Sequence, residues 1–227
     1  MKNFAFIFAR SGSKRIKNKN IQKIGEETLL EITLKQAKKI NIIQKTFLST
    51  DSKIMATIAK NLNIQVIMRP KILAKDKSSE WLAWQHAIIY VKKKYEFDKF
   101  ISLPVTSPLR STTDITNCIK MLDKSNDIVI TASETERNPW FNMVKMNKKN
   151  YVEILNKETD KIIDTRHKAP KVYDMTTVCY VSRPDYILNN KSIFSGKVSA
   201  LIIPKERSID IDTIFDLKVA RLLYSKN

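Results

Sequence analysis

Segments typical of buried β-strands alternate along this chain with segments whose apolar residues have helical spacing. The expected strands are short apolar runs at 4–8, 46–49, 64–68, 99–103 and 128–132. The expected helices lie between them, at 28–40, 53–62, 78–94 and 114–122. This order predicts an α/β fold with a mostly parallel sheet and helices on both of its faces, because each parallel connection needs a crossover.

The helix expected at 78–94 is the longest of these segments. Ser78 stands at its start as a candidate N-cap residue. The apolar spacing predicts that Leu82, Ile88, Ile89 and Val91 face the core.

The pattern changes in the second half of the chain. Short strands expected at 143–146 and 178–181 surround a polar, irregular segment at 157–171. We interpret residues 138–181 as an inserted arm for substrate contacts or a subunit interface. A strand at 199–204 and a helix at 215–224 then follow, and a chain of 227 residues suits a single domain.

The net charge of +18 permits a nucleic-acid partner, which would be a different class of function from an enzyme. Against it, the lysines are dispersed, and no interleaved aromatic residues suggest platforms for bases. No apolar run approaches the length of a membrane span. Cys118 and Cys179 lack the spacing of a metal site and suit a reducing compartment, so we expect a cytoplasmic protein.

The most informative motif is a basic loop at 9–20, directly after the apolar run at 4–8. It contains one glycine, two serines and five cations, which are Arg10, Lys14, Arg15, Lys17 and Lys19. Backbone N–H groups, hydroxyls and positive charges at the carboxyl end of a first strand suit a polyanion such as a triphosphate. Gly12 is one of only three glycines in the chain, so we expect a positive φ or a close approach to a ligand there.

This loop matches neither the P-loop frame nor the glycine pattern of dinucleotide-binding proteins. Arg10 and Lys14 are candidates to balance the charge that develops on a leaving pyrophosphate. An exposed basic turn without a ligand is the alternative.

Two aspartates near the end of the sequence form a candidate metal site. In an extended backbone Asp210 and Asp212 point to one side, with Ile211 opposite. Two hard oxygen donors at this spacing suit Mg²⁺ bound to substrate phosphates. An acidic turn that caps the next helix is the alternative.

Two more segments fall where strands are expected to end. Residues 103–110 hold two prolines and three candidate hydrogen-bond donors, Thr106, Ser107 and Arg110. A simple β–α turn is the alternative for this segment. Residues 68–79 precede a helix whose N-terminus suits an anion or the edge of a base.

Taken in order, these segments resemble those of the acylneuraminate cytidylyltransferases, the CMP-sialic acid synthetases, and their relatives for other nonulosonic acids. The resemblance extends from Phe4 to the last expected helix. It is carried by Ala9-Arg10-Ser11-Gly12-Ser13-Lys14 with Lys19-Asn20, by Arg69-Pro70 with Asp76 and Ser78-Ser79, by Thr106-Ser107-Pro108-Leu109-Arg110, and by Asp210-Ile211-Asp212-Thr213.

The resemblance implies a Rossmann-like nucleotidyltransferase over residues 1–227, with a small arm at about 138–181 for dimerisation. It implies a homodimer that joins CTP to the anomeric hydroxyl of a 2-keto-3-deoxy sugar acid and releases pyrophosphate, with Mg²⁺ as cofactor. No nucleic acid or membrane partner is implied.

The resemblance also implies roles for individual residues. Catalytic roles fall on Arg10, Lys14 and Asp212, and metal binding falls on Asp210 and Asp212. The nucleotide would be bound by Arg10, Ser11, Gly12, Ser13, Lys14, Lys19, Asn20, Arg69, Ser78, Ser79 and Thr106. Contacts to the sugar acid would come from Ser107, Arg166, Lys171 and Tyr173.

Two segments depart from the family's pattern, and both border the sugar in sialic acid synthetases. Pro104-Val105 stands where the family has Gln-Pro, and Thr176-Thr177-Val178 stands where it has Asn-Gly-Ala. An amide that contacts the sugar is therefore missing twice. The acid stays open among sialic, legionaminic and pseudaminic acids and a 3-deoxy-octulosonic acid or its amino derivative.

Overall fold

The computed structural model describes residues 1–76, 78–157 and 163–225. Within these ranges, the strands of the central sheet are β1 Asn3–Ala9, β4 Lys45–Thr50, β5 Gln65–Met68, β6 Lys99–Ser102, β7 Ile128–Glu134, β10 Tyr173–Ser182 and β11 Val198–Ile202. The helices are α1 Leu29–Lys38, α2 Lys53–Asn61, α3 Glu80–Lys92, α4 Thr112–Met121, α5 Pro184–Asn189 and α6 Ile214–Tyr224. The strand order across the sheet is β11-β7-β10-β6-β1-β4-β5.

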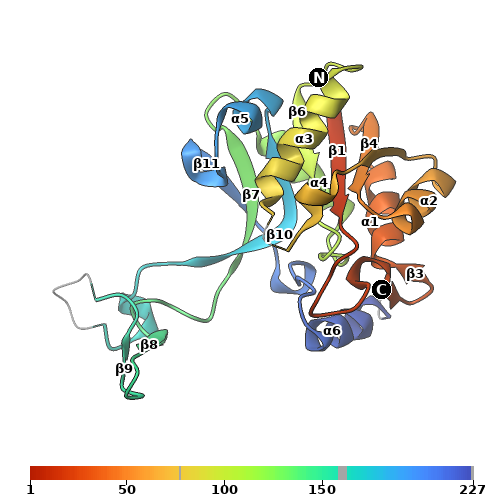
Figure 1. Cartoon of the computed structure of the whole chain (residues 1–227). Helices are drawn as coiled ribbons and strands as arrows, with labels where there is room; N and C mark the ends of the chain where they lie inside the picture. Colours follow the sequence, from red (N-terminus) through yellow and green to blue (C-terminus); the bar gives the residue numbers. More distant parts are fainter. Residues whose placement is uncertain (77, 158–162, 226–227) are drawn as a thin grey trace.

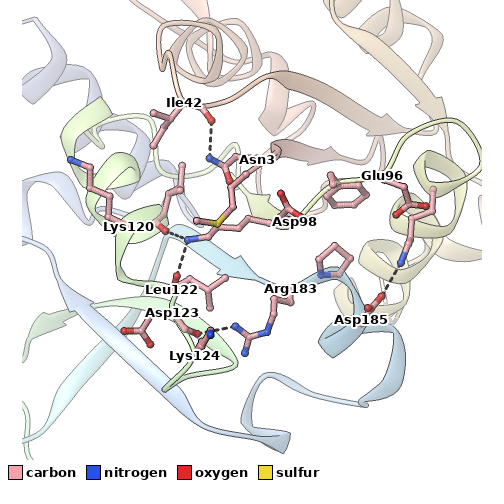
Figure 2. Close-up of a pocket in the computed structure, with 16 residues that line it drawn as sticks. Asn3, Ile42, Glu96, Asp98, Lys120, Leu122, Asp123, Lys124, Arg183 and Asp185 are labelled. Atoms are coloured by element: carbon pink, nitrogen blue, oxygen red, sulfur yellow. Dashed lines mark hydrogen bonds and ion pairs between the residues drawn. The ribbon is translucent and has the colours of Figure 1, made fainter.

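The sheet is mostly parallel, as the alternation of segments predicted. β1 runs parallel to β4 and β6, β4 runs parallel to β5, and β7 runs parallel to β11. Only β10, among the described strands of this sheet, is antiparallel to its neighbours, β6 and β7. The amino ends of β1 and β6 border a cavity (Figure 2), and their carboxyl ends lie at the opposite edge of the sheet.

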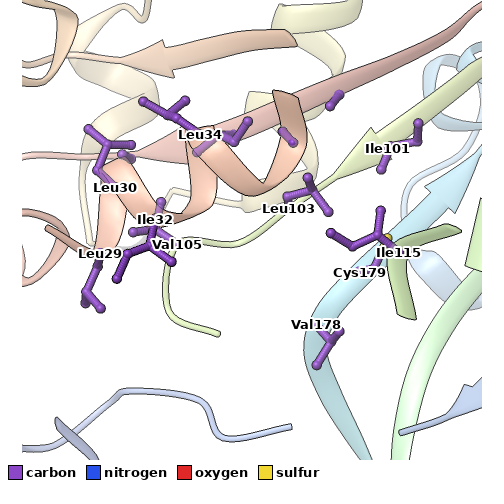
Figure 3. Packing of buried hydrophobic residues seen from close by; sticks show 14 of the residues in the cluster. Leu29, Leu30, Ile32, Leu34, Ile101, Leu103, Val105, Ile115, Val178 and Cys179 are labelled. Carbon is purple, nitrogen blue, oxygen red and sulfur yellow. The ribbon is translucent and has the colours of Figure 1, made fainter. Parts of the chain in front are cut away.

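Helices cover both faces of the sheet (Figure 1), and successive side chains of β1 enter two different cores. Ala5 and Ile7 pack with residues of α1 and α4, where Leu34 and Ile115 are fully buried (Figure 3). Phe4 and Phe6 point to the other face and join an aromatic core with Trp84 of α3. Each fully buried large apolar side chain contributes roughly 1.5–3 kcal/mol to folding.

Side-chain caps fix where several helices begin. Thr28 and Glu31 form a capping box at α1, Ser111 and Asp114 form one at α4, and the Ser52 hydroxyl caps α2. These reciprocal bonds satisfy backbone N–H groups that have no partner within the helix. Among the described residues, no helix combines the length and the apolar character that crossing a membrane requires.

Two predictions for α3 are wrong. The helix begins at Glu80 with Ser79 at the N-cap position, while the Ser78 hydroxyl donates to the carbonyl of Ile72 at 2.7 Å. Leu82 and Ile89 are exposed, whereas Ile88 and Val91 are buried as expected. Apolar residues occur all around this helix, so their spacing does not identify the buried face.

A two-stranded extension projects from the sheet between β7 and β10 (Figure 1). It contains the hairpin of β8 Val144–Met146 and β9 Val152–Ile154. Residues 158–162 of the predicted arm lie outside the described residues. Because β10 pairs with β7 in the central sheet, the projecting part covers less of the chain than the predicted range of 138–181.

Candidate active site

A cleft lies at the carboxyl ends of β1, β5 and β6, where open α/β sheets bind their ligands. It consists of two adjoining cavities of about 220 Å³ and 420 Å³, which share Arg10, Ser13 and Lys19 as lining residues. Among the predicted nucleotide-binding residues, the following line one or both cavities: Arg10, Ser13, Lys14, Lys19, Asn20, Arg69, Ser78, Ser79 and Thr106.

The larger of these two cavities has the character of an anion site. Arg10 and Lys14 both form ion pairs with the carboxylate of Asp76, each at 2.5 Å. The hydrogen bonds from Lys14 and Arg10 lower the pKa of Asp76. The Lys14 side chain is 82% exposed, so a phosphate entering from solvent can reach the same cation.

Hydrogen bonds within the basic loop set its shape. Ser11 donates from its backbone N–H and its hydroxyl to Asp51, at 2.9 and 2.6 Å, and does not line the cavities. Asn20 donates to the carbonyl of Arg10 at 3.0 Å. The expectation of a positive φ at Gly12 is wrong, and Asn18 with a φ of 56° holds that conformation instead. Close approach of a ligand to Gly12 stays a prediction.

The end of the chain meets this loop. The Lys19 ammonium donates to Asp212 at 3.0 Å and to the Ile211 carbonyl at 2.8 Å, and Arg15 donates to Asp212 at 3.1 Å. Asp212 therefore borders the same cleft as the cations near the start of the sequence, whereas Asp210 is not among the residues that line the two cavities.

Asp210 has an environment that suits a metal ion. Ile211 is fully buried and donates from its backbone N–H to the Thr106 carbonyl at 2.8 Å, which anchors the aspartates on both sides of it. Burial raises the pKa of Asp210 and the charge of Asp212 adds to this, while the Thr106 hydroxyl and Lys19 oppose it. One buried oxygen of Asp210 has no hydrogen-bond partner among the described residues.

These donors fit Mg²⁺ in a particular way. No cluster of three or more His, Cys, Asp or Glu side chains able to hold a metal occurs in the described part of the chain. Mg²⁺ is commonly held by one or two carboxylates, with water and substrate phosphates as its other ligands. Asp210 and Asp212 could supply the carboxylates, and the buried oxygen of Asp210 that has no hydrogen-bond partner among the described residues could bind such an ion.

Arg110 is a structural residue, so the expectation that it offers donors to a ligand is wrong. Its guanidinium is buried and donates to the carbonyls of Pro104 and Val178 and to the side chains of Gln36 and Thr33. Burial lowers the pKa of Arg110 to about 10, which keeps it charged at neutral pH. It joins the turn after β6 to β10 and α1.

Ser107 is also buried, and it shares a hydrogen bond of 2.6 Å with the Thr177 hydroxyl. It does not line the cleft. A direct contact between Ser107 and a sugar acid would therefore require this pair to rearrange.

Arg69 and Glu80 face the smaller cavity of the cleft. Arg69 is buried, donates to the hydroxyl and the carbonyl of Ser49 at 3.2 and 2.8 Å, and lies 5.6 Å from the centre of the Phe8 ring. The sequence interpretation missed Glu80. Its position directly after the serines at 78–79 was the available signal.

The predicted sugar contacts of the arm lie elsewhere. Arg166, Lys171 and Tyr173 line a separate cavity of about 380 Å³ at the base of the extension. Arg166 donates to the carbonyl of Glu136 at 2.6 Å. Their role in sugar binding stays a prediction, because they share no cavity with the nucleotide loop of the same chain.

The cavity at the amino ends of the strands measures about 920 Å³, and Figure 2 shows its lining. Lys99 uses two of its donors on the carbonyls of Ile119 and Leu122, each at 2.7 Å, and burial lowers the pKa of Lys99. Lys92 is paired with Asp185 at 2.8 Å. Cations and carboxylates are interspersed around this cavity, so it lacks the excess of positive charge that marks the cleft.

A family model described as Cytidylyltransferase matches residues 4–224. The chain belongs to the cytidylyltransferase family. This cytidylyltransferase is therefore a nucleotidyltransferase enzyme. Two of its relatives are aligned over almost their whole length. The cytidylyltransferase is 32% identical over 221 residues to Post-translational flagellin modification protein B of Campylobacter coli, with 96% of this chain and 92% of that protein covered.

A second relative is the CMP-N,N'-diacetyllegionaminic acid synthase of Campylobacter jejuni. It is 31% identical over 223 residues, which cover 96% of the cytidylyltransferase and 93% of the relative. Among solved structures, CMP:2-keto-3-deoxy-manno-octonic acid synthetase complexed with CTP superimposes with a TM-score of 0.75 at 15% identity, covering 100% and 99% of the two chains. This likeness confirms the Rossmann-like nucleotidyltransferase fold.

Proposed function

We propose that this cytidylyltransferase transfers CMP from CTP to the anomeric hydroxyl of a 2-keto-3-deoxy sugar acid of the nonulosonic type. The hydroxyl oxygen forms a bond to the α-phosphorus, the bond from that phosphorus to the bridging oxygen breaks, and pyrophosphate leaves with the electron pair. The hydroxyl proton passes to solvent. The observation that carries the proposal is the ion pair between Lys19 and Asp212, which joins the basic loop to the acidic segment near the end of the sequence. The name of the legionaminic acid relative supports the class of acid.

The basic loop would bind the triphosphate. Phosphate oxygens would take the place that the Asp76 carboxylate holds between Arg10 and Lys14. Both cations then neutralise charge on the leaving pyrophosphate. Phosphoryl-type transfer needs little covalent participation by the protein, so positioning and charge neutralisation supply most of the rate enhancement.

Asp210 and Asp212 would hold Mg²⁺. When bound, the ion would neutralise phosphate charge and lower the pKa of the attacking hydroxyl. Lys19 holds the Asp212 carboxylate at 3.0 Å and also donates to the backbone at Ile211, so it orients the acidic segment toward the phosphates.

The extension would mediate a homodimer. Its hairpin exposes a set of apolar side chains that suits a second copy of the chain, namely Val144, Met146, Tyr151, Val152 and Leu155. In such a dimer, Arg166, Lys171 and Tyr173 would contact the sugar acid in the partner's cleft. This arrangement accounts for their distance from the nucleotide loop of their own chain.

A pyrophosphate-release assay tests the proposal, with CTP or UTP and a panel of nine-carbon and eight-carbon keto sugar acids. We expect Mg²⁺-dependent release with CTP and at least one nine-carbon acid. Release with none of the acids, or with an eight-carbon acid alone, would contradict the proposed substrate class. A gel shift with steep salt dependence would instead support the nucleic-acid alternative.

A further inference from the structure

We propose that the Glu80 carboxylate accepts a hydrogen bond from a donor on the nucleoside half of the nucleotide substrate. Glu80 would then be a specificity-determining residue of this enzyme. This inference rests on the proposed function and names one more contact within it. CTP carries suitable donors in two places, the amino group of cytosine and the hydroxyls of ribose.

The division of the cleft into two cavities carries the first part of the argument. The larger cavity is lined by Lys14, Arg15, Asp76 and Asp212, the groups suited to phosphates and to a metal ion. The smaller cavity lacks these four residues and is lined by Phe8, Arg69, Glu80, Ala83 and others. If the phosphates occupy the larger cavity, the nucleoside is left with the smaller one.

Glu80 differs in charge from the rest of its cavity. Among the described residues that line the smaller cavity, the other charged groups are all cations, namely Arg10, Lys19, Arg69 and Lys75. An anionic group of a substrate has several partners there and would be repelled by Glu80 alone. A neutral N–H or O–H donor has the reverse preference, because a carboxylate only accepts hydrogen bonds.

The carboxylate is held in place but remains available. Its single hydrogen bond within the described chain comes from the Trp84 indole, at 3.3 Å, one helical turn later. Trp84 is itself buried, with its ring 5.4 Å from the rings of Phe100 and Tyr180. Glu80 lines the smaller cavity, and no second side-chain hydrogen bond to its carboxylate comes from the described residues.

The electrostatic environment agrees with this geometry. Desolvation raises the pKa of Glu80, and neither the Trp84 bond nor the charge of Arg69 overcomes it. Glu80 is nonetheless exposed, so a donor that enters the cavity can reach its carboxylate, which has a single hydrogen-bond partner in the described chain. A bound nucleoside supplies that donor.

The test measures binding of CTP, UTP, 2′-deoxy-CTP and 3′-deoxy-CTP by calorimetry, with Mg²⁺ and without sugar acid. The variants are Glu80→Ala and Glu80→Gln, and Glu96→Gln at the opposite edge of the sheet is the matched control. We expect Glu80→Ala to weaken CTP by roughly 10- to 100-fold, as for the loss of a hydrogen bond to a charged group. The analogue that lacks the donor should bind Glu80→Ala as tightly as it binds wild type. Glu96→Gln should bind every nucleotide with wild-type affinity.

The analogues distinguish the two sources of the donor. If Glu80 reads cytosine, Glu80→Gln gains affinity for UTP, because its amide can donate to the uracil carbonyl. If Glu80 accepts from ribose, the preference for CTP over one deoxy analogue disappears in Glu80→Ala and is smaller in Glu80→Gln, whose amide oxygen still accepts a hydrogen bond but carries no charge. Unchanged CTP affinity overturns the assignment, and so does an equal loss for every nucleotide, which would indicate a structural or metal-related role. A wild-type enzyme that binds CTP but releases no pyrophosphate with any acid would refute the proposed function and leave this test valid.

Discussion

Removing the Arg110 guanidinium should destabilise the fold rather than impair nucleotide binding directly. The side chain donates to four groups on three segments, including the buried carbonyls of Pro104 and Val178. Truncation to alanine leaves at least two buried acceptors without these donors, at about 1–3 kcal/mol each. It also leaves a cavity. We therefore expect Arg110→Ala to lower the free energy of unfolding by about 3–5 kcal/mol, a large part of a typical total of about 5–15 kcal/mol.

Urea unfolding at pH 7, followed by circular dichroism, measures this loss. The control is Arg137→Ala, at an exposed arginine, which should change the free energy of unfolding by less than about 0.5 kcal/mol. Arg110→Lys should fall between wild type and Arg110→Ala, because an ammonium keeps the charge but lacks the planar fork. A loss below about 1 kcal/mol in Arg110→Ala would refute the structural role. A raised KM for CTP in a fully stable Arg110→Lys would do the same.

Three further predictions concern carboxylates and a cation. Asp212→Asn should abolish turnover while changing stability by under about 1 kcal/mol, because its ion pair with Lys19 is half exposed; a wild-type kcat would contradict the metal assignment. Lys14→Ala should raise the KM for CTP more than that for the sugar acid, and unchanged CTP kinetics would remove Lys14 from the site. Burial alone would raise the pKa of Asp114, but hydrogen bonds from Arg207 and from its capping box lower it. Its charge therefore stabilises the fold above the unfolded pKa of about 3.9, and this contribution is lost as the pH falls through the lower folded pKa. Asp114→Asn should be less stable than wild type by about 2 kcal/mol at pH 7 in urea unfolding, and the gap should narrow below about pH 4; a gap that does not change with pH would rule out the ion pair as its cause.

Local signals were sufficient to predict most of the fold. Apolar runs located the core strands, and the helices expected at 53–62 and 114–122 begin at Lys53 and Thr112, within two residues of the expectation. The buried face of α3 was not predictable, because Leu82 and Ile89 are as apolar as the residues that pack. The direction of β10 was not predictable either, since it depends on the path of the extension before it.

The candidate site shows the same division between local and distant information. Short motifs placed the basic loop at the end of a strand and identified the aspartates as a candidate metal site. They could not reveal that Lys19 contacts Asp212, because those residues are 193 positions apart. Nor could they distinguish the buried Arg110 from an exposed loop arginine, because burial depends on how α1 and β10 close over it. Glu80 stood beside a predicted motif, and only the cavity marks it as part of the site.

The ion pairs of the cleft suggest how it accommodates a triphosphate. Arg10 and Lys14 face Asp76, and Lys19 faces Asp212, so the protein's own carboxylates already hold these cations in a fixed arrangement. All these pairs are partly open to solvent, and exposed pairs contribute little to stability. Exchanging the Asp76 carboxylate for phosphate oxygens therefore costs little, while the cations keep much of their order and lose less entropy on binding. The cations of the cleft offer a compact polyanion several partners at once, so the +18 charge does not by itself imply a nucleic-acid partner.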